Sequence, residues 1–137
     1  MLVGEDLDQM GYWEDQEDEE AYVTDPLWYV REFAKVTQQE PTPYLYAALI
    51  QEEFDEWRSA YLKQDYLNEI KELADILYVV YGYANAMGWD ISEALWRVHE
   101  NNLGRVVQDD GTIHRRDDGK IIKNPNAEKI DLRDLLK

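Results

Sequence analysis

Four carboxylates stand in two pairs that have the same spacing along the sequence. Glu53 and Glu56 form one pair, and Glu72 and Asp75 form the other. Because residues three apart on an α-helix share a face, each pair predicts an acidic patch on one helix. Oxygen ligands of this kind are what Mg²⁺ takes in proteins, where the ion usually keeps waters and substrate phosphates as well.

The two pairs are placed symmetrically about a short polar turn near residues 63–65. In an antiparallel helical hairpin centred on residue 64, Glu56 lies opposite Glu72. In the same register, Glu53 lies opposite Asp75. Four carboxylates brought together repel one another unless a cation neutralises them. The alternative is two solvated acidic helix faces, but both pairs interrupt apolar stripes, where an unpartnered carboxylate is costly.

The elements that must position these groups are helices. Apolar residues at helical spacing predict helices over about 26–38, 43–62, 65–86 and 90–102. Thr24-Asp25-Pro26 is the expected start of the first helix, a capping residue followed by Pro at the first helical position. Thr42 is the expected cap of the second helix, and Gly88 and Gly104 are expected to follow the last two. The predicted core stripe of the third helix is Ile70, Leu73, Leu77, Val80 and Ala84.

The two ends of the chain differ from this helical middle. Residues 1–20 carry many acids and no Lys or Arg, which is typical of a disordered or loosely docked arm. Residues 112–116 and 120–123 flank Asp117-Asp118-Gly119, a pattern that predicts a hairpin. We therefore expect an all-α four-helix bundle over 23–104, with an acidic N-terminal arm (1–22) and a C-terminal hairpin and tail (105–137).

Composition limits the function classes. The formal net charge of −16 argues against nonspecific binding to nucleic acid. With no apolar run of transmembrane length and no basic, apolar start, we expect no membrane span or signal peptide. The absence of cysteine excludes disulfides and thiolate metal sites. We expect a cytoplasmic protein.

Aromatic residues off the core stripe, such as Tyr78 and Tyr81, favour a homodimer or homotetramer.

Four motifs follow one another along the chain: Leu-Ile-x-Glu-Glu-x-x-Glu-Trp, Glu-x-x-Asp-Ile-Leu-Tyr-Val-Val-x-Gly, Gly-Trp-Asp and Val-His-x-x-Asn. In this order they resemble the all-α nucleoside triphosphate pyrophosphohydrolases, and the resemblance covers about Trp28 to Lys123. That superfamily includes MazG, the dimeric dUTPases and phosphoribosyl-ATP pyrophosphohydrolase. The chain looks most like the short, single-domain MazG-like forms of phages and bacteria, and a phage protein would act in the host cytoplasm. The resemblance implies hydrolysis of a (d)NTP between the α and β phosphates, giving (d)NMP and pyrophosphate.

The resemblance also implies roles for particular residues. Glu53, Glu56, Glu72 and Asp75 would hold Mg²⁺, or Mn²⁺ in its place, making Glu53 part of the catalytic centre; Glu52 would orient the attacking water.

Substrate contacts are expected further along the chain. Asn102 and Arg105 match a stretch that ends in Asn-Met-Ser-Lys in the family, although Leu-Gly replaces Met-Ser here. Lys120 and Lys123 are candidates to contact phosphates; alternatively, they are ordinary solvated lysines. Two other functions stay open: a noncatalytic acidic interaction protein, and a nucleotide-binding regulator without turnover.

Overall fold

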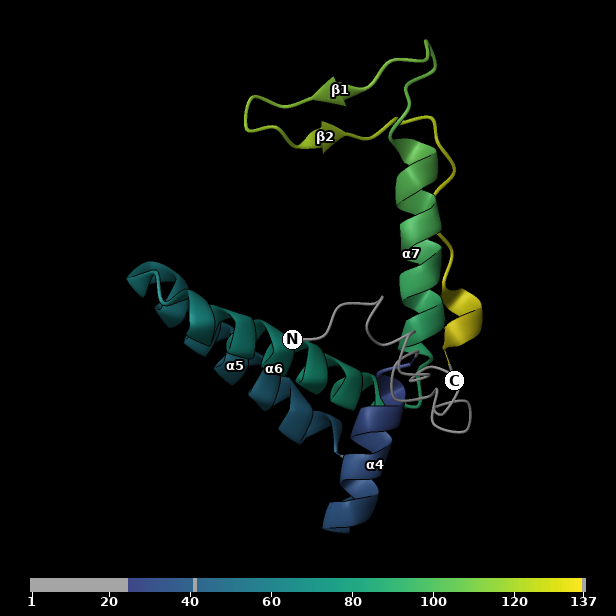
Figure 1. The fold of residues 1–137 in the computed structure, drawn as a ribbon. Helices are drawn as coiled ribbons and strands as arrows, with labels where there is room; N and C mark the ends of the chain where they lie inside the picture. The colour runs from purple at the N-terminus through teal and green to yellow at the C-terminus, as the bar shows by residue number, and fades with distance from the viewer. Residues whose placement is uncertain (1–24, 41, 137) are drawn as a thin grey trace, which may run out of the picture. The chain divides into compact units, whose positions relative to one another are not determined.

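The structure is a computed structural model that describes residues 25–40 and 42–136. Within these residues the chain forms four α-helices, a two-stranded hairpin and one 3-10 turn (Figure 1). The elements are α4 (Leu27–Thr37), α5 (Pro43–Lys63), α6 (Tyr66–Met87), α7 (Ile91–Arg105), β1 (His114–Arg115), β2 (Ile121–Ile122) and η2 (Arg133–Leu135). These elements confirm the predicted all-α class with a C-terminal hairpin. The acidic arm and Thr24 lie outside the described residues.

Side-chain caps explain where the helices begin. Thr42 Oγ1 accepts a hydrogen bond from the Leu45 backbone N–H at 3.3 Å, which confirms Thr42 as the cap of α5. At the start of α7, a carboxylate oxygen of Asp90 accepts from the Glu93 N–H at 3.0 Å. Both caps satisfy backbone donors that have no partner within the helix.

The helix ends use left-handed backbone conformations. Gln64 follows α5 with φ of 56°, and Gly88 follows α6 with φ of 74°. Gly88 was predicted for this role because glycine adopts positive φ without a steric penalty. Helix α7 runs through Gly104 and ends at Arg105, beyond the predicted end at about residue 102.

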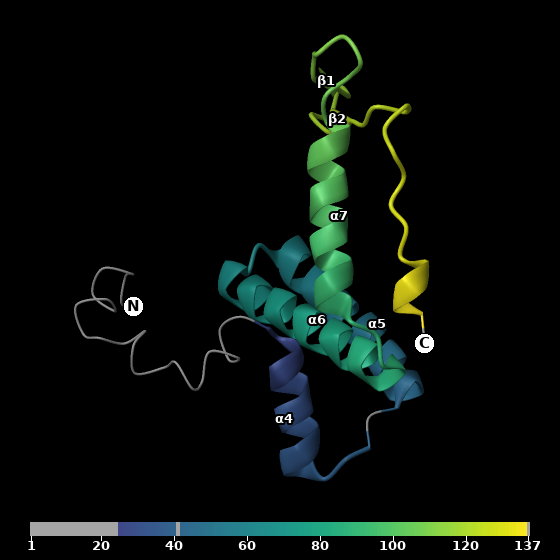
Figure 2. The same ribbon diagram turned by 90° about the vertical axis from the view of Figure 1, so that its right-hand side faces the viewer.

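The chain divides into two compact units after Met87. In the first unit, α5 and α6 lie side by side along their length, and α4 packs against α6 (Figures 1 and 2). Its buried side chains come from all three helices: Leu27, Val30, Tyr46, Ala60, Val79, Tyr81 and Ala84. The predicted boundaries of the arm, helical domain and tail remain predictions.

Gly82 sets the closest approach between α5 and α6. A Cβ atom built at Gly82 would lie 2.2 Å from Cε1 of Tyr46, so the tyrosine ring occupies the space that any other side chain would need. Tyr46 itself is only 7% exposed. The face of α6 that contains Val79 and Gly82 is therefore the one that packs against α5.

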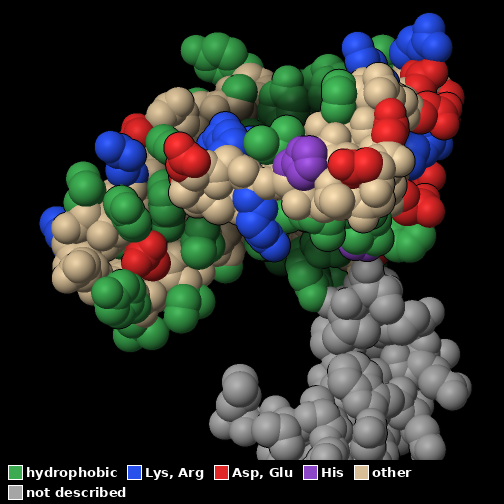
Figure 3. All heavy atoms as spheres, turned by 90° about the horizontal axis from the view of Figure 1, so that it is seen from above, with side chains coloured by type: hydrophobic (Ala, Val, Ile, Leu, Met, Phe, Trp, Pro, Cys, Tyr) green, Lys and Arg blue, Asp and Glu red, His purple; other side chains and the backbone are tan. Residues whose placement is uncertain are grey.

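The predicted core stripe of α6 was partly wrong. Ile70, Leu73 and Leu77 are 67%, 48% and 61% exposed, because packing with α5 uses another face of the helix. Tyr81, predicted to lie off the core, is instead buried. An exposed apolar stripe does exist, but it is made of different residues. Figure 3 shows exposed hydrophobic side chains spread among charged ones on the face that it draws.

The second unit is α7 with the segment that follows it. The hairpin pairs His114 with Ile122 and Arg115 with Ile121 in antiparallel register. The later segment returns along α7, as Figures 1 and 2 show in yellow.

Side chains of α7 bind the returning segment. Arg97 binds both carboxylate oxygens of Asp134, at 2.6 and 2.9 Å, and the Asn101 side chain donates to the Glu128 carbonyl at 2.9 Å.

None of the helices in the described part of the chain is long and apolar enough to cross a membrane.

Candidate metal centre

Three carboxylates from two helices converge in the α5–α6 hairpin. Glu53 and Glu56 lie about one turn apart on α5, and Glu72 lies in the second turn of α6. One oxygen from each side chain can be chosen so that all three lie within 4.8 Å of one another. The turn after Lys63 thus produces, for these three residues, the register that the symmetry of the sequence predicts.

Burial makes this arrangement costly without a cation. Glu72 is only 4% exposed, Glu53 is half-buried and Glu56 is exposed. The Oε2 atoms of Glu53 and Glu72 are buried without a hydrogen-bond partner. A buried polar atom left without a partner costs about 1–3 kcal/mol, and more when it is charged.

The same burial changes the acid–base behaviour of the cluster. The pKa of Glu53 is raised from 4.5 to about 7, first by burial, then by a hydrogen bond with Glu72 and by the charges of Glu56 and Asp75. The pKa of Glu72 is lowered, chiefly by the hydrogen bond with Glu53 and further by Lys71. Of the two acids, Glu53 is therefore the one that takes up a proton first as the pH falls toward neutral. A bound cation would take the place of that proton.

Asp75 is held in a different way from the other three acids. Its Oδ2 lies 2.8 Å from Nζ of Lys71, which also lies 3.3 Å from Oε1 of Glu72. Among the described residues, Asp75 is not part of the three-carboxylate group, although its charge still raises the pKa of Glu53. Sequence reasoning missed Lys71. The signal was its i,i+4 spacing to Asp75, which places the two side chains on one helix face.

The donor set fits a hard divalent cation. All three groups offer carboxylate oxygens, which Mg²⁺ and Mn²⁺ prefer. Two oxygens bound to one Mg²⁺ at about 2.1 Å can be no more than about 4.2 Å apart. The present span of 4.8 Å therefore needs only small side-chain adjustments. The two unpartnered Oε2 atoms of Glu53 and Glu72 are the groups that such an ion would satisfy.

The other residues predicted to act in the site are not part of the three-carboxylate group. Glu52 is exposed on α5, next to the cluster in sequence. In the second unit, Nζ of Lys123 donates to Oδ1 of Asn102 at 2.6 Å, so the structure brings these two together. Arg105 ends α7, and its Nε is buried without a hydrogen-bond partner. Lys120 is exposed just before β2.

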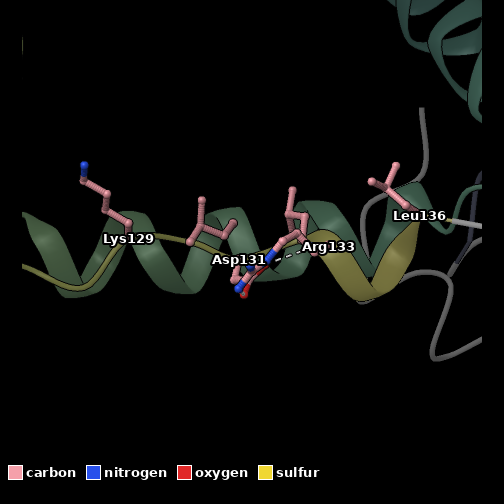
Figure 4. Close-up of a pocket in the computed structure, with 6 residues that line it drawn as sticks. Lys129, Asp131, Arg133 and Leu136 are labelled. Carbon is pink, nitrogen blue, oxygen red and sulfur yellow. Dashed lines mark hydrogen bonds and ion pairs between the residues drawn. The ribbon is translucent and has the colours of Figure 1, made fainter.

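A separate hollow of about 570 Å³ lies along the C-terminal segment and is lined by residues between Lys129 and Leu136. Figure 4 shows Asp131 and Arg133 close together on this segment, joined by an ion pair of 2.7 Å. Because these two charges neutralise each other within one stretch of chain, the hollow offers a weaker case for chemistry than the carboxylate cluster.

Comparison with known proteins identifies a family but no curated relative. No curated protein matches this sequence. The sequence model of one family, phosphoribosyl-ATP pyrophosphohydrolase, matches residues 28–102, more than half of the chain. The match spans the three carboxylates and Asp75 and ends at Asn102, before Lys120 and Lys123. The family is metal-dependent in general, and the acidic cluster could hold a metal ion.

The matched segment, the helical architecture and the carboxylates on facing helices agree on one assignment. They indicate a nucleotide pyrophosphohydrolase type of activity, and the chain belongs to the phosphoribosyl-ATP pyrophosphohydrolase family, within the MazG-like superfamily.

Proposed function

We propose that this protein is an Mg²⁺-dependent nucleoside triphosphate pyrophosphohydrolase that cleaves a (d)NTP between its α and β phosphates. The products would be a (d)NMP and pyrophosphate. The observation that carries the proposal is the group formed by Glu53, Glu56 and Glu72, with two buried oxygens that lack partners. An anionic substrate would not approach such a group in a chain of net charge −16 unless cations stood between them.

The chain's own residues would divide the work as follows. Glu53, Glu56 and Glu72 would hold the metal, and Asp75 would join them as a fourth ligand. When bound, the ion would neutralise the triphosphate and polarise a water for attack at phosphorus. Glu52, an exposed carboxylate beside the cluster in sequence, would orient that water by accepting a hydrogen bond from it.

The second unit carries the other side chains that we propose to bind phosphate or nucleotide groups. Lys123 and Lys120 carry the positive charges suited to phosphate oxygens. Asn102 would position the Lys123 ammonium group through the hydrogen bond of 2.6 Å. Arg105, the last residue of α7, would offer its guanidinium group as a donor to the substrate.

The test is a substrate panel. The purified protein would be incubated with each common NTP and dNTP and with phosphoribosyl-ATP, in Mg²⁺, Mn²⁺ or EDTA, and the products would be separated by ion exchange. We expect monophosphate and pyrophosphate from one or a few substrates, with none formed in EDTA. Orthophosphate and a nucleoside diphosphate would refute α–β cleavage.

Matched variants would locate the chemistry. Glu56→Gln removes one member of the cluster, whereas Glu69→Gln removes an acid from the first turn of α6 outside the cluster. We expect the first variant to lose turnover and the second to retain it. Nucleotide binding without turnover by the wild-type protein would instead favour a regulator, and absence of both would favour the acidic interaction protein.

We also propose that two copies associate through the exposed stripe of Ile70, Leu73 and Leu77 on α6. These side chains follow i, i+3 and i+7 spacing, so they form one continuous apolar face. Leu77→Glu should convert a dimer into a monomer in sedimentation experiments without changing the helical content. Leu136→Glu, in the C-terminal segment, is the control because that leucine is equally exposed. A monomeric wild-type protein would refute the proposal.

A further inference from the structure

Lys71 bridges two of the acids that the metal proposal uses. Its ammonium nitrogen lies 2.8 Å from Asp75 Oδ2 and 3.3 Å from Glu72 Oε1. Asp75 is thereby held in an ion pair, while the three-carboxylate group forms without it. The proposed function assigns no role to this cation.

We propose that Lys71 is a built-in counter-ion that competes with the metal and has to move into water before Asp75 can join the other carboxylates. This inference rests on the proposed function, because it presumes that the cluster takes a divalent cation. It makes Lys71 a positioning residue that sets metal affinity and controls the fourth ligand.

The exposures of the partners decide which group can move. The Lys71 side chain is 64% exposed, so it can turn into solvent with little loss of packing. The Glu72 side chain is only 5% exposed and is fixed within the hairpin. Asp75 is intermediate, at 37%, and can rotate once its partner leaves. Lysine suits this role because its charge sits on a flexible stem and makes no rigid bidentate contact.

Electrostatics explain why the ammonium lies there in the first place. The negative charges of Glu72 and Asp75 attract the ammonium group and hold it against their oxygens, at 3.3 and 2.8 Å. An ammonium that stays charged cannot share these oxygens with a divalent ion a few ångströms away. A competing interpretation is that Lys71 merely orders the two acids for the metal. The two interpretations predict opposite changes in metal affinity.

Calorimetric titration of the metal-free, full-length protein with Mg²⁺ would measure that change. Lys71→Gln removes the charge, and Lys71→Arg keeps it. Lys63→Gln is a control that changes the net charge equally at the last residue of α5, the other helix of the hairpin. Because the Lys71 ammonium contacts two of the proposed ligands through solvent-exposed ion pairs, we expect Lys71→Gln to bind Mg²⁺ several-fold more tightly. Lys71→Arg should bind Mg²⁺ no more tightly than the wild-type protein, because arginine keeps the charge and can hold Asp75 in a bidentate contact. Lys63→Gln should bind like the wild-type protein.

A second readout uses the wild-type protein alone. Lysine acylation followed by mass spectrometry reports how available each ammonium group is. Saturating Mg²⁺ should increase the reactivity of Lys71 several-fold and leave that of Lys63 unchanged.

The outcomes separate the two proposals. Equal or weaker Mg²⁺ binding by Lys71→Gln, or unchanged reactivity of Lys71 in Mg²⁺, would overturn the role of Lys71 while leaving the metal centre in place. No Mg²⁺ binding by the wild-type protein or by Lys71→Gln would overturn both. Binding by Lys71→Gln alone would support the competition in its strongest form.

Discussion

Replacing Glu53 by Gln should stabilise the metal-free protein at alkaline pH while destroying its metal site. Glutamine has nearly the same volume as glutamate, so the packing of α5 against α6 is kept. Its amide N–H₂ can donate to Glu72, whose Oε2 lacks a partner in the cluster. The substitution therefore reproduces the protonated form of Glu53 at every pH.

The size of the effect follows from the pKa of Glu53. Its rise from 4.5 to about 7 in the fold sets an upper limit of about 3 kcal/mol on the lost stability. Solvent access and the lowered pKa of Glu72 reduce this, and we expect about 1–2 kcal/mol. A raised folded-state pKa means that stability is complete below about pH 4.5 and is lost as the pH rises through about 7.

The assay is thermal unfolding in EDTA, followed by circular dichroism at several pH values between about 4 and 8. We expect the wild-type protein to lose stability over this range relative to Glu53→Gln. The variant should melt several degrees higher at about pH 8 and within a degree or so of the wild-type protein at about pH 4. The exposed neighbour variant Glu52→Gln should follow the wild-type curve.

Added Mg²⁺ should reverse the order. At about pH 8 the wild-type protein should gain stability with Mg²⁺, and Glu53→Gln should not. If Glu53→Gln melted lower than the wild-type protein in EDTA at about pH 8, or if both showed the same pH dependence, the reasoning about a shared, buried proton would be wrong.

Three further predictions concern other positions. Gly82→Ala should destabilise the first unit by about 1–3 kcal/mol in urea unfolding, because its Cβ would overlap the Tyr46 ring; adding Tyr46→Leu should recover part of the loss, and additive effects would contradict the contact. Asp75→Asn should abolish turnover with unchanged circular dichroism, and near wild-type rates in saturating Mg²⁺ would rule out Asp75 as a ligand. Thr42→Ala should cost about 1 kcal/mol through the lost cap, whereas an unchanged midpoint in urea would show that the cap contributes nothing.

Local rules were enough to predict the helices. Thr42 as a cap and Gly88 after α6 follow from hydrogen bonding and backbone conformation within a few residues. These preferences act before any tertiary contact forms, so they can be derived from the sequence. The end of α7 differed because nothing in the helix excludes Gly104, and the helix continued to Arg105.

The approach of Glu53, Glu56 and Glu72 could also be predicted from the sequence. Helical spacing and a short turn leave few ways to pair α5 with α6, so equal distances from the turn imply juxtaposition. Asp75 has the same symmetry, yet it is paired with Lys71. The position of the Asp75 carboxylate depends on its side-chain rotamer and on the nearest positive charge, here Lys71. The spacing of residues along the sequence does not determine either.

The sequence by itself therefore determined the helix positions, the hairpin register and the acidic character of the candidate site. The tertiary structure alone decided which face of α6 is buried. Helical periodicity places Ile70 and Leu77 on an apolar stripe that could equally well have been the buried face of α6. In the structure the Tyr46 ring packs on Gly82, so the face that contains Gly82 is buried instead. That steric fit between distant residues buries the Glu72 face, and with it the carboxylate that makes the cluster hold a proton or a cation.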